Sequence, residues 1–339
     1  MQKNKTILLV FFALAVYVAM GIYADINQLT LAIQSFHWPY FILLLLFTSI
    51  GYFLRYLKWD IFLKNTGVNL TFKQNIFIFI SGLSMIVTPG KLGEVWKAWL
   101  IKDISGDELS KTVPVVILDR VTDILSLVIL SAFGILSYRD GIYLLATLFF
   151  MILVFYVSIT SKRISGKMIS VIENRAMKHS SDVKGLHGTF QKLMEPKLFI
   201  SLSLLNVLAW FCECLGFYFI VIGFDQYLSI SQSTFIFSFA SLAGGVSMIP
   251  GGIGLAEVTI AGFLQHNGFT PTITIGTALI VRLGSFWYGV ILGLIVYLLF
   301  RKKIIPNNGC GLKNNHITSS EEFNVKSYCS ENITKDDIR

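Results

Sequence analysis

Two arginines in this sequence lie inside long apolar stretches, where a charge is costly unless it has a partner or a task. Arg120 lies within residues 115–121 and Arg282 within residues 278–283, and most neighbours in both stretches are apolar. A guanidinium is well suited to hold a phosphate or a carboxylate, because its planar fork donates two parallel hydrogen bonds. Charged side chains of this kind inside apolar segments indicate a binding site for an anion.

A Pro-Gly motif precedes each arginine at nearly the same distance. Counted from the proline, the arginine follows after 31 residues in the first copy and after 32 in the second. The motif residues are Pro89, Gly90, Lys91, Gly93 and Glu94 in the first copy, and Pro250, Gly251, Gly252, Gly254 and Glu257 in the second. A motif that occurs twice in this way predicts two related halves around one site.

Each Pro-Gly motif interrupts an apolar segment and so predicts a helix that breaks and then restarts. The N-terminus of the restarted helix presents unpaired backbone N–H groups and about half a positive charge, which favours a bound anion. Lys91 adds a further positive charge to the first motif. Glu94 and Glu257 fall in the first turn of the restarted helices. They either offset the helix dipole and pair with an arginine, or take part in proton coupling or contact a substrate amine.

Two aspartates accompany the first arginine. Asp119 and Asp123 stand four residues apart and therefore share one face of a helix. Pairing with Arg120, Lys91 or Arg55 inside a helix bundle is the structural interpretation. Contact with a substrate is the alternative.

Glu213 is the one acid well inside the apolar segment 198–222, where it either pairs with Arg282 or contacts the substrate. We expect each buried arginine to have an acidic partner at rest, because an unpaired charge in lipid is costly. Arg120 and Arg282 take equivalent places in the two halves. An anionic head group that crosses the membrane is therefore expected to pass from one arginine to the other.

The composition is that of a membrane protein. Of the 339 residues, 54% are hydrophobic and 14% are charged, whereas roughly a quarter are charged in soluble domains. The net charge of +8 comes mostly from a few loops and the C-terminal segment, as the positive-inside rule requires, and predicts no nucleic-acid binding. The four cysteines and five histidines show no spacing typical of a zinc site.

Apolar runs long enough to cross a bilayer, which takes about 20 residues, recur along the chain. The predicted full spans are residues 7–23, 38–57, 113–136, 142–160, 198–222 and 273–300. A cleaved signal peptide is the alternative for the first of them. The link 161–197 is rich in Lys and Arg, which places it in the cytoplasm. The cytoplasmic end of the second span is assigned from Arg55, Lys58, Lys64 and Lys73.

The segments 71–112 and 235–264 must each begin and end on one side of the membrane. This predicts a re-entrant hairpin with Pro-Gly at its tip, and a pair of short full crossings is the alternative. The predicted fold class is an all-α polytopic membrane protein with two inverted repeats, each of three full spans plus one re-entrant helical hairpin broken at Pro-Gly. The predicted boundaries are 1–303 for the transmembrane unit, about 7–137 and 142–300 for the repeats, and 304–339 for a disordered cytoplasmic tail. Both termini are expected in the cytoplasm.

The two motifs and the pair Asp119-Arg120 resemble the flippase-like transmembrane region of the lysylphosphatidylglycerol synthetases, over roughly residues 7–300. The resemblance implies a membrane protein that moves an aminoacylated lipid between leaflets, while a separate soluble domain makes that lipid. No segment of the sequence resembles the soluble domain, so synthetase activity is not expected. Some members of this family are associated with isoprenoid-phosphate-linked sugars instead.

The sequence therefore predicts a cell-membrane translocase for an anionic lipid head group, such as a phospholipid or an isoprenoid-phosphate-linked lipid. An ion- or proton-coupled transporter of a small anion, an intramembrane enzyme acting on a lipid phosphate, and an accessory protein are the alternatives. No catalytic residue, metal or cofactor is predicted, because the sequence has no Asp-rich diphosphate motif, paired histidines or nucleophile constellation. The expected partners are membrane lipids and a separate lipid-modifying enzyme or glycosyltransferase, and the oligomeric state stays open.

Overall fold

The computed structural model describes residues 22, 26–88, 93–135, 183–247 and 249–305. Every regular element in these residues is a helix, and no strand occurs among them. The expectation of an all-α membrane protein is therefore confirmed at the level of helices and their composition. Except for Ile22, the predicted span 7–23 lies outside the described residues, as do the predicted span 142–160 and almost all of the predicted tail.

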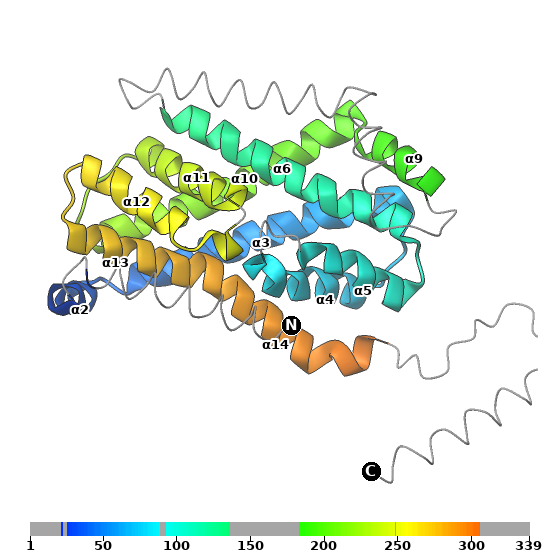
Figure 1. Cartoon of the computed structure of the whole chain (residues 1–339), viewed down its shortest axis with the longest axis horizontal. Helices are drawn as coiled ribbons and strands as arrows, with labels where there is room; N and C mark the ends of the chain where they lie inside the picture. The colour runs from blue at the N-terminus through cyan, green and yellow to red at the C-terminus, as the bar shows by residue number, and fades with distance from the viewer. Residues whose placement is uncertain (1–21, 23–25, 89–92, 136–182, 248, 306–339) are drawn as a thin grey trace, which may run out of the picture.

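Three long helices cross the centre of the molecule (Figure 1). α3 (Pro39–Thr66) and α10 (Pro196–Gly223) have 28 residues each and are apolar enough to cross a membrane. Each begins with proline at its first position, where the missing backbone N–H costs nothing. α6 (Leu109–Ile135) has 27 residues, or about 40 Å of helix, and holds charged residues in its middle.

The last long run is continuous from Pro271 to Ile304, and it too is long and apolar enough to span a membrane. It consists of α13 (Pro271–Arg282), the π-helical turn η4 (Leu283–Trp287) and α14 (Tyr288–Ile304). A π-helical turn inserts an extra residue into a helix and often marks a functional site. This turn begins directly after Arg282, the second arginine that the sequence singled out.

Two pairs of short helices fill the space between the long ones. The elements are α4 (Phe72–Leu83), η1 (Ser84–Val87) and α5 (Trp96–Ser105) in the first pair, and α11 (Ile230–Val246), η3 (Pro250–Gly252) and α12 (Leu255–His266) in the second. The members of each pair pack against each other, and the two short turns η1 and η3 are in contact. The breaks that the Pro-Gly motifs predicted therefore meet in the interior, where the two pairs approach from opposite ends of the molecule (Figure 1).

The two pairs begin with the same capping chemistry. Thr71 and Gln74 form a capping box at the start of α4, and Ser229 and Gln232 form one at the start of α11. In each box the hydroxyl of the first residue accepts a hydrogen bond from the backbone N–H of the glutamine, three residues on. The glutamine side chain accepts one from the backbone N–H of the first residue. The paired caps fix where each short helix starts.

Each pair of short helices packs against a long helix from the other half of the sequence. α4 and η1 pack against α14, whereas α11 packs against α6, and α3 packs against α10 between them. Gly293 permits the first of these contacts, since a Cβ there would lie 2.5 Å from the backbone N of Ser84. Gly134 permits the contact of α6 with α11, since a Cβ there would lie 2.6 Å from the backbone N of Phe235.

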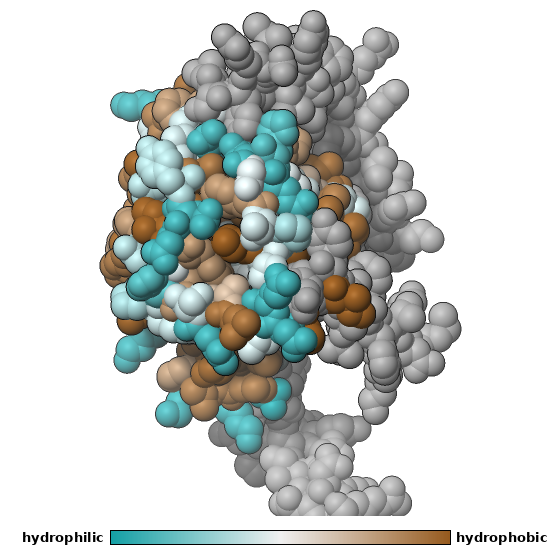
Figure 2. Space-filling model, turned by 90° about the vertical axis from the view of Figure 1, so that its left-hand side faces the viewer, coloured by the Kyte–Doolittle hydropathy of each residue, from teal (hydrophilic) through white to brown (hydrophobic). Residues whose placement is uncertain are grey.

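Two further short helices lie at the ends of the molecule (Figure 1). α2 (Ile26–Ser35) packs against α13, and α9 (Val183–Leu193) packs against α6 and α3. A helix thus lies between the predicted spans 7–23 and 38–57, and another lies within the predicted link 161–197. Figure 2 looks onto the end that carries α2, where hydrophilic and hydrophobic side chains mix, as they do where apolar helices meet water.

The close contact at Gly293 gives a first prediction. We expect Gly293→Ala to lower the free energy of unfolding by about 1–3 kcal/mol, because the added methyl group meets the backbone of Ser84 and Ile80. Gly262→Ala is the matched control. Gly262 also lies inside a helix, but a Cβ there meets nothing within 4 Å, so its replacement leaves stability unchanged or slightly raised. Thermal unfolding in detergent measures both, and equal melting temperatures for the two variants would contradict this packing.

Candidate functional site

A cavity of about 80 Å³ lies where the two breaks meet, which exceeds the space that one water molecule needs. The two breaks contribute Ile86 and Thr88 from one side and Ile249, Gly251 and Gly252 from the other. The long helices contribute the polar side chains Tyr52, Arg55, Trp210, Glu213, Arg282 and Ser285. The remaining lining is mostly apolar. Two guanidinium groups thus share one small, mainly apolar cavity.

Arg282 holds the second break in place. Its Nε donates to Oε1 of Glu257 at 2.7 Å, and its Nη2 donates to the carbonyl oxygen of Gly251 at 2.6 Å. Its guanidinium carbon also lies 4.5 Å from the ring centre of Phe286. One side chain therefore binds an acid, a backbone carbonyl and an aromatic ring at the cavity wall.

The backbone at this break adopts conformations that favour glycine. Gly251 and Gly252 have φ angles of 62° and 64°, in the left-handed region. There is also no room for a side chain, since a Cβ on Gly251 would lie 2.5 Å from Phe286 and one on Gly252 would lie 2.8 Å from Gly244. The equivalent Pro89 and Gly90, together with Lys91, lie outside the described residues.

Glu257 takes the place that the sequence assigned to a bound anion. It is fully buried in the first turn of α12, and its Oε2 accepts from the backbone N–H of Gly254 at 2.8 Å. Its other oxygen pairs with Arg282. Glu257 thus offsets the dipole of α12 and neutralises the arginine, which is the structural role among the two that the sequence left open.

Arg55 pairs with Glu213 across the cavity wall, with Nη2 of Arg55 on Oε1 of Glu213. The guanidinium also lies 4.1 Å from the ring centre of Trp210. Two sequence-based assignments are corrected here. Glu213 pairs with Arg55 rather than with Arg282. Arg55 lies in the interior, as the sequence expected of a partner for buried acids, and not at the cytoplasmic end of its span, because α3 continues to Thr66.

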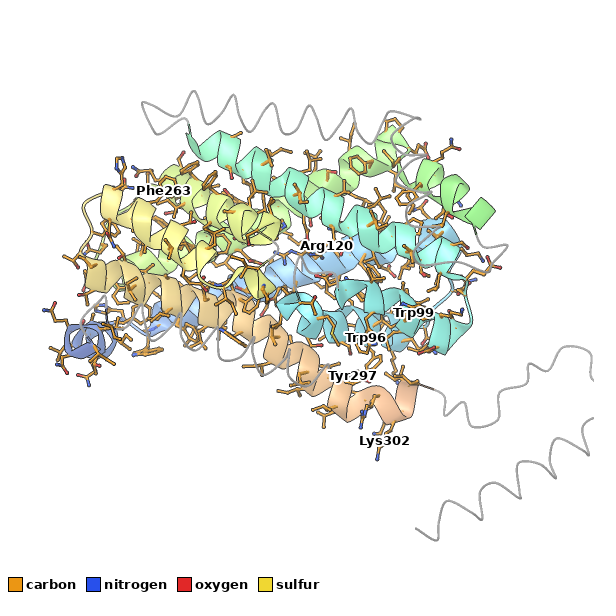
Figure 3. The ribbon with its side chains drawn as sticks, viewed as in Figure 1. Trp96, Trp99, Arg120, Phe263, Tyr297 and Lys302 are labelled. Carbon is orange, nitrogen blue, oxygen red and sulfur yellow. The ribbon has the colours of Figure 1, made fainter. Side chains whose placement is uncertain are left out.

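The first arginine lies in a separate group of buried charges near the middle of the molecule (Figure 3). Nη2 of Arg120 lies 2.8 Å from Glu94 and 3.0 Å from Asp119, and its Nη1 lies 2.9 Å from Asp123. Each buried arginine therefore has acidic partners, as expected. Arg120 does not line the cavity, so the structure does not bring the two arginines to one place.

Two lysines complete this group, and the sequence interpretation missed both as members of it. Lys58 is fully buried, 2.8 Å from Asp119 and 3.3 Å from Asp123. Lys97 lies 3.0 Å from Glu94 and 3.4 Å from Asp119. Lys58 was assigned to a cytoplasmic flank because basic residues follow it. Lys58 follows Arg55 by three residues and so lies on the same face of the helix. This spacing is the sequence signal that could have placed Lys58 in the interior.

The predicted site residues thus fall into two groups. The cavity unites Gly251, Gly252, Arg282 and Glu213, with Glu257 behind Arg282. The buried group unites Glu94, Asp119 and Arg120. Gly93 donates its backbone N–H to Thr88 at 2.7 Å, Pro250 starts η3, and Gly254 precedes α12. Within the described residues no group of histidines, cysteines and acids is placed to hold a metal ion.

The second prediction compares two lysines on α3. Lys58→Met removes a cation from the buried group and leaves Asp119 and Asp123 under-neutralised, which we expect to cost about 3–5 kcal/mol of stability. Lys64→Met removes a lysine whose side chain is 72% exposed and pairs with Asp60, so it leaves stability nearly unchanged. Expression and thermal unfolding in detergent measure both. Equal tolerance of the two substitutions would show that the buried charges do not hold the helices together.

Comparisons with known proteins agree on one family. Residues 10–293 match the model of the lysylphosphatidylglycerol synthase TM region. A UPF0104 membrane protein of Pyrococcus horikoshii is 24% identical over 90% of this chain and 100% of its own length. A UPF0104 membrane protein of Methanothermobacter thermautotrophicus is 26% identical over 84% of this chain and 91% of its own length. Another, from Methanocaldococcus jannaschii, is 27% identical over 68% of this chain and 99% of its own length. The chain therefore belongs to the family of the lysylphosphatidylglycerol synthase transmembrane region.

Proposed function

We propose that this membrane protein translocates lipids with an anionic head group, and that the head group binds in the cavity between the two helix breaks. One observation carries the proposal: Arg55 and Arg282 both line this cavity inside a bundle of apolar helices. Two guanidinium groups at one place favour a phosphate, which accepts several charge-assisted hydrogen bonds.

The surroundings of the two arginines favour an amphipathic substrate. Phe237, Ile249, Ile260 and Phe286 line the same cavity, so apolar groups lie beside the charged ones. A lipid presents both kinds of surface, with its phosphate for the guanidinium groups and its glycerol or isoprenoid portion for the apolar walls. The cavity is small for a whole lipid, so the acyl or isoprenoid chains remain in the surrounding bilayer.

The proposed path uses two inverted repeats, and four paired features of the structure support this. The proline starts of α3 and α10 and the capping boxes of α4 and α11 recur in corresponding places. The packing of the short pairs also corresponds, since α4 packs on α14 and α11 packs on α6. An acid–arginine pair recurs as well, formed by Glu94 with Arg120 and by Glu257 with Arg282. Broken helices that meet between inverted repeats form the substrate sites of many transporters. The head group is then exposed alternately to either side.

The third prediction tests the arginine of the cavity. Arg282→Lys keeps the charge but cannot hold Glu257 and the Gly251 carbonyl at once, and it loses the fork for phosphate. We expect translocation to slow by about tenfold or more. Arg301→Lys is the control, because Arg301 is exposed in the last turn of α14 and its replacement leaves the rate unchanged.

The assay follows fluorescently labelled phosphatidylglycerol and polyprenyl phosphate between the leaflets of proteoliposomes, with labelled inorganic phosphate as a third arm. Movement of either lipid supports the proposal and identifies its class. Uptake of inorganic phosphate without lipid movement would instead indicate a transporter of a small anion. A chemically altered lipid would indicate an intramembrane enzyme. If Arg282→Lys moves lipid at the parent rate, the cavity arginine has no part in translocation.

The fourth prediction concerns the orientation, which we propose from the positive-inside rule. The link between α5 and α6, residues 106–108, should face the cytoplasm, and residues 267–270, between α12 and α13, should face outside. Single cysteines at Asp107 and Asn267, in a background without cysteine, are labelled with a thiol reagent that does not cross membranes. In intact cells only the cysteine at 267 should react, and the opposite result would invert the orientation.

A further inference from the structure

The four charges at the cavity cancel one another. Arg55 and Arg282 are positive, and their partners Glu213 and Glu257 are negative. All four side chains are at most 13% exposed, so water does little to stabilise an imbalance. A phosphodiester head group that enters this cavity adds one negative charge. The complex is neutral again only if a further positive charge, such as a proton, enters with the anion.

The contacts of Arg55 allow its guanidinium to exchange one hydrogen-bond acceptor for another. Its Nη2 binds Glu213, yet its buried Nε has no hydrogen-bond acceptor in the part of the chain that the structure describes. A buried donor without an acceptor is costly, and a phosphate beside Arg55 provides one. The guanidinium stacks over Trp210, which holds its plane while its acceptor changes.

Glu213 and Glu257 differ in their place relative to the cavity and in the contacts of their oxygens. Glu257 uses both oxygens, one for Arg282 and one for the N–H of Gly254, and its charge stabilises the start of α12. Glu213 lines the cavity itself and pairs with Arg55, which lines the cavity too. Transfer of Arg55 to a phosphate would break this ion pair and bring a second negative charge beside Glu213.

Resting on the proposed function, we infer that the Arg55–Glu213 pair couples head-group binding to proton uptake. The incoming phosphate takes the guanidinium of Arg55 from Glu213, and one proton from water binds to the Glu213 carboxylate as the phosphate arrives. Release of the head group lets the proton leave and the ion pair form again. The protein therefore carries one proton with each monoanionic head group.

Glu213 is the group in this wall whose charge can change in this way. The ionisable groups around it are Tyr52 and Arg55 on α3, Cys212 and Cys214 on α10, and Arg282 across the cavity, with Asp123 on α6 acting on Arg55. Asp123 is held by Arg120, Lys58 and Asn206. The arginines keep their charge, and the tyrosine and the thiols are neutral at the start, so none of them can accept the proton.

Calorimetry of the purified protein in detergent tests this coupling. Short-chain phosphatidylglycerol and farnesyl phosphate are titrated in buffers of different ionisation enthalpy, which reveals the protons taken up on binding. We expect about one proton per phosphatidylglycerol, with the affinity rising up to about tenfold for each unit by which the pH falls. Glu213→Gln should still bind the lipid but with no proton uptake and no such pH dependence. Asp225→Asn, which removes an exposed acid that does not line the cavity, should behave like the parent.

Two other results would overturn the inference, and they differ in what else they reject. Binding of phosphatidylglycerol without proton uptake, or proton uptake that persists in Glu213→Gln, rejects the coupling and leaves the translocase proposal intact. Failure of both lipids to bind the parent protein rejects the anion site itself, and the coupling with it.

Discussion

The structure depends on the pairing of charges that are largely held away from water. Five basic side chains, Arg55, Lys58, Lys97, Arg120 and Arg282, meet five acidic ones, Glu94, Asp119, Asp123, Glu213 and Glu257, within the described residues. Most of these pairs join elements that are distant in the sequence or lie beside a helix break, and Arg120 also pairs with Asp119 and Asp123 within α6. Because a lone charge in such an interior is far more costly than a pair, the helices can pack only in arrangements that keep these partners together.

The helix breaks depend on the same pairing. Arg282 binds the carbonyl of Gly251 and the carboxylate of Glu257, so one side chain both fixes the position of the second break and supplies one of the two positive charges that line the cavity. The π-helical turn follows Arg282 at once, and such a turn gives a long helix a place to adjust. A ligand that competes for Arg282 would therefore act on the backbone of the break as well as on its charge.

The sequence predicted the helical membrane fold and the two breaks, because apolar length and Pro-Gly are local signals. It also predicted that both arginines have acidic partners, since that follows from the cost of burial alone. It left two positions open for Arg55 and missed Lys58 and Lys97, because basic residues near the end of an apolar run look the same whether they flank a membrane or face the interior. Which acid meets which base depends on the packing of α3 against α10 and α6, and no local pattern encodes that.

We propose that an anionic head group binds between Arg55 and Arg282. A cryo-electron microscopy map of the protein in nanodiscs rich in phosphatidylglycerol tests it most directly. We expect density for a phosphate in the cavity, within about 3 Å of both guanidinium groups, and Glu213 turned away from Arg55. A cavity without such density, with ordered phosphates only on the outer surfaces of the helices and the Arg55–Glu213 pair intact, would contradict it.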